Sequence, residues 1–145
     1  MQGVEDAAKA CVCGNLRRTS RAITQFYDKL LSPSGINITQ LALLCTISID
    51  NSSTISEISK EMYMDRTTLT RSLNLLEKQD FIQIESSSDR RKRIVTITSR
   101  GKAQISKALP LWENAQSIIM QKFGKGNWRE MKMGLNEISN IARFN

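Results

Sequence analysis

The sequence predicts a mainly α-helical fold that carries one small β-hairpin in the middle of the chain. Apolar residues recur every three or four positions over most of the 145 residues, which is the spacing of one helix face. Between residues 81 and 98 the period changes to two, which is typical of strands. A chain of this length buries one core, so we expect a single folded unit.

The first predicted element is one long helix from Val4 to Leu31. Its apolar face comprises Val12, Leu16, Ile23, Phe26 and Leu30. Pro33 and Gly35 are expected to end it, because proline removes a backbone donor and glycine adopts dihedral angles that a helix excludes.

A second helix is expected to begin at Thr39, whose hydroxyl can cap it. Its predicted buried face comprises Leu41, Ala42, Leu44, Cys45 and Ile49. Residues 50–53 are polar and are expected to form a loop.

Two shorter helices are predicted next, one with Ser56 as its N-cap and the other with Asp65. The second runs to Gln79 and buries Leu69, Leu73 and Leu76. The strands that follow cover residues 81–85 and 93–98, and the turn between them is followed by four basic residues in a row. Two helices and a hairpin with a basic tip predict a winged helix-turn-helix, which inserts its second helix into the DNA major groove.

The last predicted elements are a helix over residues 99–123 and a final helix capped by Asn127, with a glycine hinge between them. Pro110 should bend the first of these or remove one of its hydrogen bonds. The final helix carries apolar residues at coiled-coil-like spacing, namely Trp128, Met131, Leu135, Ile138 and Ile141. Together with the first helix, this is more apolar surface than one small lobe can cover, so we expect a homodimer.

Composition limits the class of protein. The net charge is +7 with a pI near 9.6, which favours an acidic partner such as nucleic acid. There is no apolar run of about 18 residues and no signal peptide, so we expect a cytoplasmic protein without a membrane partner. With no histidine and only three cysteines, we expect no metal site, no cofactor, no catalytic residues and no enzyme.

The solvent face of the predicted recognition helix has the chemistry of a DNA-reading surface. Its residues are Arg66, Thr67, Thr68, Thr70, Arg71 and Asn74, and no acid stands between Asp65 and Glu77. Arginine can bind guanine bidentately, and threonine offers base edges a hydroxyl and a methyl group. A merely solvated face stabilised by ion pairs would need acids here, so we prefer the DNA interpretation.

The basic tip of the hairpin can reach the neighbouring minor groove, whose negative potential attracts arginine. Because alternate residues of an extended chain face opposite ways, the four basic residues cannot share one role. Arg90, Arg91 and Lys92 are the expected DNA contacts, whereas Arg93 is expected to lie too far along the strand to reach DNA.

In these residues the sequence resembles the MarR family of transcription regulators. Residues 89–101, DRRKRIVTITSRG, are similar to the family's wing pattern D-x-R-x-x-x-V-x-L-T-x-x-G, with Ile97 in place of leucine. Residues 53–82 resemble the family's helix-turn-helix, and residues 13–44 resemble its first two helices. Tyr63 and Asp80 depart from it, since many members have glycine at these two places.

The resemblance implies a homodimeric repressor that binds double-stranded, pseudo-palindromic operator DNA and is released by a small phenolic or anionic effector. Residues 1–35 and 99–145 would be dimerisation helices, and residues 36–98 the DNA-binding lobe. Arg91 would be the minor-groove arginine and Asp89 the acid that orients the wing. The main major-groove contacts would be Thr67, Thr68 and Arg71.

The resemblance also implies an alternative, regulation by an organic hydroperoxide or by thiol oxidation. Cys13 lies where one branch of the family has its reactive cysteine, and Tyr27 lies where that branch has a hydrogen-bonding tyrosine. Fourteen residues on one helix span about 21 Å, so the two could meet only across a dimer. The competing interpretation is that Cys11 and Cys13 are small residues near a dimer interface.

Overall fold

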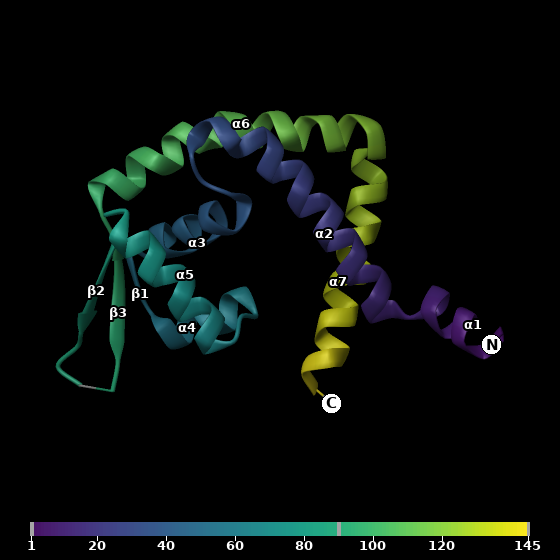
Figure 1. The fold of residues 1–145 in the computed structure, drawn as a ribbon, viewed down its shortest axis with the longest axis horizontal. Helices are drawn as coiled ribbons and strands as arrows, with labels where there is room; N and C mark the ends of the chain where they lie inside the picture. The colour runs from purple at the N-terminus through teal and green to yellow at the C-terminus, as the bar shows by residue number, and fades with distance from the viewer. Residues whose placement is uncertain (1, 90, 145) are drawn as a thin grey trace.

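The predicted class, mainly helical with a small β-structure, is confirmed by the computed structural model, which describes residues 2–89 and 91–144. Arg90, one of the expected DNA contacts, lies outside the described residues. A long helix, α6 (Ser99–Phe123), forms the top of an arch in Figure 1. A lobe of short helices and strands lies under one end of α6, and at the other end α7 (Lys125–Phe144) turns downward.

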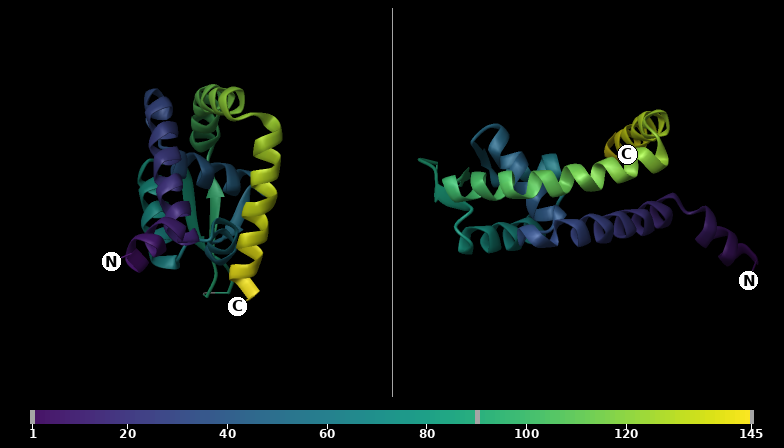
Figure 2. Two further views of the ribbon diagram at one scale, coloured as in Figure 1. Left: turned by 90° about the vertical axis from the view of Figure 1, so that its right-hand side faces the viewer. Right: turned by 90° about the horizontal axis from the view of Figure 1, so that it is seen from above.

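The N-terminal segment forms two helices, α1 (Gln2–Ala10) and α2 (Val12–Leu31), so the expectation of one continuous helix was wrong. Cys11 is extended, with ψ of 112°, and its Sγ accepts a hydrogen bond of 3.3 Å from the Gly14 N–H. The thiol thus acts as the N-cap of α2. Figure 2 shows α2 running beside α6, while α1 projects beyond them.

The predicted end of α2 is confirmed. A 3-10 turn, η1 (Ser32–Ser34), follows it, and Gly35 takes a φ of 84° that favours glycine. The side chain of Gln104 in α6 donates a 2.7 Å hydrogen bond to the carbonyl of Ser34, which ties this corner to the arch.

The N-cap of helix α3 (Ile38–Ile49) is Asn37 and not Thr39, so the helix begins two residues earlier than predicted. The Asn37 side chain accepts from the Gln40 N–H at 2.8 Å, and the Gln40 side chain accepts from the Asn37 N–H at 3.0 Å. The buried face differs from the prediction, since it comprises Leu41, Leu43, Leu44 and Ile47. Ile49, the last residue of α3, is 79% exposed, so its predicted burial was wrong.

Ser52 and Ser53, expected as part of a loop, form a short strand together with Thr54, β1 (Ser52–Thr54). The sheet has the order β1-β3-β2 and is antiparallel, with β2 (Ile82–Ser86) and β3 (Arg93–Ile97) forming the predicted hairpin. Thr54 of β1 stands opposite Ile94 of β3. The central strand therefore links the wing to the segment that precedes the helix-turn-helix.

The helix-turn-helix consists of α4 (Ile55–Met62) and α5 (Arg66–Lys78). Asp65 is the N-cap of α5, as predicted, but α4 begins after Thr54 and not at Ser56. Thr54 and Glu57 form a reciprocal capping box, which outcompetes the serine two residues later. Their lobe and the sheet share one core, whose fully buried side chains include Leu43, Leu44, Ile47, Ile58, Leu69, Leu73, Leu76, Ile82 and Val95.

The C-terminal arm departs from the prediction at one point. Helix α6 continues through Pro110, and Gly124 ends it with a φ of 92°. Helix α7 already begins at Lys125, so Asn127 is not its N-cap. The Asn127 side chain instead donates a 2.7 Å hydrogen bond back to the carbonyl of Phe123, which holds the turn between the two helices.

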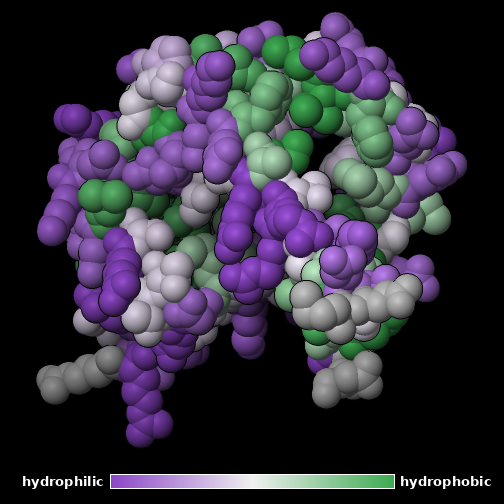
Figure 3. Space-filling model, turned by 45° about the vertical axis from the view of Figure 1, so that its right-hand side comes forward, coloured by the Kyte–Doolittle hydropathy of each residue, from purple (hydrophilic) through white to green (hydrophobic). Residues whose placement is uncertain are grey.

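Large apolar side chains remain exposed on the helices outside the lobe. They include Val4, Val12, Leu16, Ile23, Leu109, Phe123, Met131, Met133, Ile138 and Ile141. Figure 3 shows apolar residues gathered near the top of the molecule, where α6 lies. Among the described residues, no single helix is apolar and long enough to cross a membrane; α2 with η1 and α3, bent by 75°, pass that test only as a pair.

Candidate DNA-binding surface

Helix α5 separates its apolar and polar residues as the sequence predicts. Leu69, Leu73 and Leu76 are fully buried in the lobe. Of the six α5 residues expected to contact DNA, Thr70 is half-buried and the others are exposed: Arg66, Thr67, Thr68, Arg71 and Asn74. The exposed face therefore presents two guanidinium groups, hydroxyls and an amide to a partner.

The start of α5 is held by Asp65 and Thr68. The Asp65 carboxylate accepts from the Thr68 N–H at 2.9 Å and from the Thr68 hydroxyl at 2.6 Å. The hydrogen bonds of the Thr68 side chain and backbone lower the pKa of the Asp65 carboxyl below its ordinary value. Since its single hydroxyl proton is donated to Asp65, Thr68 can offer a base only an acceptor oxygen or its methyl group.

Asp89 shapes the turn at the tip of the wing. Its carboxylate accepts a hydrogen bond of 3.2 Å from the Arg91 N–H, and its carbonyl accepts one of 2.9 Å from the Lys92 N–H. The Ser87 hydroxyl also donates to the Asp89 carbonyl, at 2.7 Å. The side chains of Arg91 and Lys92 are exposed beyond this turn. These contacts hold the backbone of the turn at Arg91 and Lys92, and the role of Asp89 in DNA binding stays a prediction.

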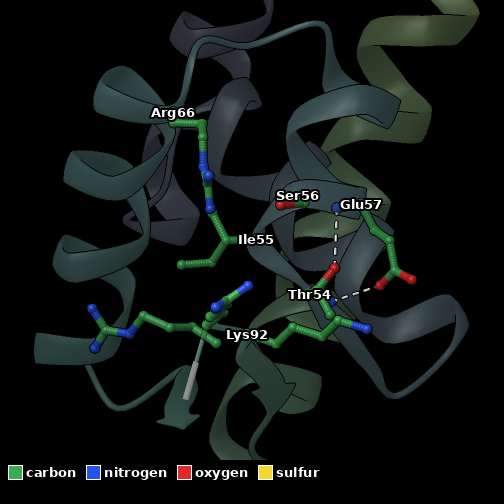
Figure 4. A pocket seen from close by; sticks show the side chains of 8 residues that line it. Thr54, Ile55, Ser56, Glu57, Arg66 and Lys92 are labelled. Carbon is green, nitrogen blue, oxygen red and sulfur yellow. Dashed lines mark hydrogen bonds between the residues drawn. The ribbon is translucent and has the colours of Figure 1, made fainter. Parts of the chain in front are cut away.

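A cavity of about 100 Å³ lies between the wing and the starts of α4 and α5. Its lining comprises Thr54, Ile55, Ser56, Glu57, Arg66, Arg91, Lys92 and Arg93. In Figure 4, Arg66 reaches toward Ile55 from one side, and Lys92 crosses below Thr54. The cavity thus brings together residues of the wing and of the recognition helix that are far apart in the sequence.

Glu57 is the one acid in this lining. Its carboxylate accepts from the Thr54 N–H at 2.7 Å, while the Glu57 N–H donates to the Thr54 hydroxyl at 3.2 Å. These bonds to Thr54, with a smaller contribution from the charge of Lys92, lower the pKa of Glu57. Sequence reasoning missed Thr54, Ser56, Glu57 and Arg93 as parts of this surface, although the T-x-x-E pattern of a capping box was visible at residues 54–57.

The redox candidates lie apart within the chain. Cys13 is exposed in the first turn of α2, two residues after Cys11, whose thiol caps that helix. Tyr27 is buried, and its hydroxyl donates a 2.5 Å hydrogen bond to the side-chain oxygen of Gln116 in α6. Burial raises the pKa of the Tyr27 hydroxyl. Within the part of the chain that the structure describes, no three side chains of metal-ligating type come together.

Comparison with known proteins gives consistent results. The sequence profile of the MarR family matches residues 36–93. The crystal structure of the Mycobacterium tuberculosis transcriptional regulator MosR in complex with DNA is 32% identical, covers 92% of this chain and 96% of its own, and superposes with a TM-score of 0.83.

Two proteins of Bacillus subtilis are also similar. The HTH-type transcriptional regulator YwhA is 28% identical over 83% of this chain and 85% of its own length. The organic hydroperoxide resistance transcriptional regulator is 28% identical over 69% of both chains.

Proposed function

Since the chain belongs to the MarR family, we propose that it is a sequence-specific DNA-binding transcription regulator and not an enzyme. The observation that carries this proposal is the cavity between the wing and the start of α5, because residues of both elements line it and both therefore lie on one side of the lobe. The related MosR chain, which covers nearly the whole of this chain, was crystallised with DNA. The natural partner is double-stranded operator DNA.

Each part of the surface has its own task in this proposal. The exposed face of α5 enters the major groove, where Thr67, Thr68 and Arg71 contact base edges. Arg66, Thr70 and Asn74 flank them along the same helix. This division places base recognition on the rigid helix and leaves the wing to read the shape of the duplex.

On the wing, Arg91 enters the minor groove, while Arg90 and Lys92 contact phosphates. Asp89 supports this arrangement because it holds the Arg91 backbone through a hydrogen bond. The wing therefore contributes affinity and shape recognition, whereas α5 contributes most of the base preference.

The protein would act as a homodimer. The apolar side chains of α1, α2, α6 and α7 that remain exposed in one chain include Val12, Leu16, Ile23, Phe123 and Ile138. Covering them with a second copy removes apolar surface from water and places two lobes side by side. A pseudo-palindromic operator fits such a two-fold arrangement.

We infer that the regulator is a cytoplasmic repressor, released from its operator by a small phenolic or anionic effector. The dimerisation helices at residues 1–35 and 99–145 would flank the lobe at residues 36–98. An effector bound between these helices and the lobe would change the distance between the lobes of the two chains. The connection between α6 and β3 is direct, since Thr98 caps α6 immediately after the strand ends at Ile97.

A second candidate function is redox regulation through Cys13. It is favoured by the exposure of the Cys13 thiol and by the similarity to the organic hydroperoxide resistance regulator. Tyr27 lies about 21 Å from Cys13 along α2, so it would reach the thiol only across the dimer. Its hydroxyl would then have to give up the hydrogen bond that it donates to Gln116. Titration of the thiols before and after treatment with an organic hydroperoxide tests it: unchanged DNA affinity after oxidation of Cys13 excludes it.

The main proposal is tested by a gel-shift measurement with the DNA upstream of the gene. We expect a tight complex that a scrambled duplex of the same composition does not compete away. Sedimentation of the free protein should give twice the mass of one chain. A protein that binds both duplexes equally weakly would contradict sequence-specific regulation.

A further inference from the structure

We propose that the cavity between the wing and the starts of α4 and α5 binds one phosphate group of the DNA backbone, held by Arg66 and Arg93. This inference rests on the proposed function, because it names the partner group of one part of the same surface. It also reverses the sequence-based expectation for Arg93, which placed this residue too far along its strand to reach DNA.

The first argument is the position of the cavity. Arg66 is the first residue of the major-groove helix, Arg91 is the minor-groove residue, and both line the cavity. In a duplex, one sugar-phosphate strand separates a major groove from the adjacent minor groove. DNA that places one groove on α5 and the other on the wing must therefore run this strand over the cavity.

The second argument is charge. Arg66, Arg91, Lys92 and Arg93 line the cavity, and within the described parts of the chain none of their side chains makes a hydrogen bond or an ion pair. The one carboxylate, Glu57, is engaged in the cap of α4, where it accepts from the Thr54 N–H. Four cationic side chains against one carboxylate leave the hollow with a positive excess that favours an anion, and a guanidinium can bind two phosphate oxygens at once.

The third argument is the shape and the remaining lining. The cavity has roughly the volume that three water molecules take in the liquid, which suits a group of a few heavy atoms such as phosphate. Ser56 adds a hydroxyl donor, and Ile55 contributes an apolar side chain that is 6% exposed. The cavity lies at the N-terminal end of α4, where the helix dipole adds to the attraction of the arginines.

The first test is the salt dependence of binding by Arg93→Gln and Arg66→Gln, measured on a duplex that the wild-type protein binds. Loss of one phosphate contact should weaken binding and reduce the slope of log K against log salt by about 0.9. For Arg93→Gln, the ratio of affinities for specific and scrambled duplexes should stay the same, because phosphate contacts carry no base information. Lys107→Gln, an exposed lysine of α6 outside the cavity, is the matched control and should change neither quantity.

The decisive test replaces one backbone phosphate at a time with a neutral methylphosphonate. We expect one position in each half-site where this change weakens binding of the wild-type protein more than it weakens binding of Arg93→Gln, which keeps only the Arg66 contact to that phosphate. Thermal unfolding of each variant checks that the exposed substitutions leave the fold intact.

Three outcomes would overturn the inference in distinguishable ways. If Arg93→Gln kept the affinity and salt slope of the wild-type protein, the phosphate site would be refuted and the proposed function would be unaffected. Competition by inorganic phosphate at constant ionic strength, with no sensitive methylphosphonate position, would assign the cavity to a free anion instead. If the wild-type protein bound no duplex specifically, the proposed function would fall with it.

Discussion

The guanidinium of Arg143 lies over the ring of Tyr63, with its central carbon 5.0 Å from the ring centroid. Arg143 belongs to the last turn of α7, and Tyr63 ends α4 inside the helix-turn-helix. The contact therefore joins a helix outside the lobe to the turn that sets the angle between α4 and α5. Tyr63 holds a left-handed φ of 51°, a conformation that favours glycine, but its aromatic ring offers Arg143 a contact that glycine could not make.

The first prediction concerns this cation–π contact. Arg143→Gln should lower the free energy of unfolding by about 0.5–1 kcal/mol, the range for such pairs at exposed sites. In a Tyr63→Gly background the same substitution should have no effect. Urea titrations of the four proteins at one fixed concentration give the coupling directly, because dimer stability depends on concentration. Equal effects of Arg143→Gln in both backgrounds would show that the contact contributes nothing.

The second prediction concerns the backbone of Tyr63. A residue with a Cβ atom in the left-handed region costs about 1–2 kcal/mol, whereas glycine adopts it freely. Once Arg143→Gln has removed the partner of the ring, Tyr63→Gly should therefore raise the free energy of unfolding by about 1 kcal/mol. Thermal unfolding of the single and double variants measures this. A lower melting temperature in the double variant than in Arg143→Gln alone would mean that the Tyr63 side chain makes another stabilising contact.

The third prediction concerns the junction between the wing and α6. A Cβ atom at Gly101 would lie 2.1 Å from the carbonyl oxygen of Phe81 and 2.9 Å from a side-chain carbon of Ile97. Gly101→Ala must push strand and helix apart and should cost at least about 1–3 kcal/mol of stability. Gly126→Ala is the matched control, because a Cβ atom there meets nothing within 4 Å. If both variants melted at the wild-type temperature, the close approach at Gly101 would be refuted.

The fourth prediction concerns pH. Because folding lowers the pKa of Asp65 from its ordinary value of 3.8, the folded chain binds fewer protons than the unfolded chain just above and below that pH. The stabilisation by this carboxylate is present above the ordinary value and is lost as the pH falls through the lower, folded-state pKa. Asp65→Asn keeps an oxygen acceptor for the Thr68 N–H but does not titrate. The variant should therefore lose less stability than the wild-type protein when urea titrations at pH 6 and about pH 3 are compared.

The fifth prediction separates the two groove-reading elements. Arg91→Ala should weaken binding to every duplex and reduce its salt dependence. Arg71→Ala should also relax the preference at one base pair, by about 1–3 kcal/mol of discrimination. Binding of a panel of single-base operator variants distinguishes the two effects. A uniform loss with Arg71→Ala would reassign that residue to the backbone.

Much of the fold could be predicted because its signals are local. The change of period from helix to hairpin, the cap at Asp65 and the breaker at Gly35 act within a few residues. Strand β1 was missed because Ser52, Ser53 and Thr54 have no strand pattern of their own and become a strand only by pairing with β3. The break at Cys11 was missed because a thiol that caps a helix carries no strong sequence signal.

The candidate surface was predicted in part for the same reason. The exposed face of α5 follows from helical periodicity, so Arg71 and Asn74 are placed where the pattern puts them. No sequence pattern shows that the Thr68 hydroxyl is bound to Asp65, or that Arg93 and Arg66 line one cavity. These relations depend on side-chain conformation and on how the wing packs against α4, which only the three-dimensional structure supplies.

The pairing of Thr54 with Ile94 has a consequence for the length of the operator. Thr54 caps α4 and also belongs to the sheet that carries the wing, and α4 in turn packs against α5. The distance between the wing and the recognition helix is therefore set by one connected unit. An extra base pair inside a half-site lengthens the duplex by about 3.4 Å. Either α5 or the wing would then no longer be aligned with its groove. A base substitution, in contrast, would cost only its own contact. The protein should therefore tolerate base substitutions within a half-site far better than insertions or deletions that change the length of the half-site.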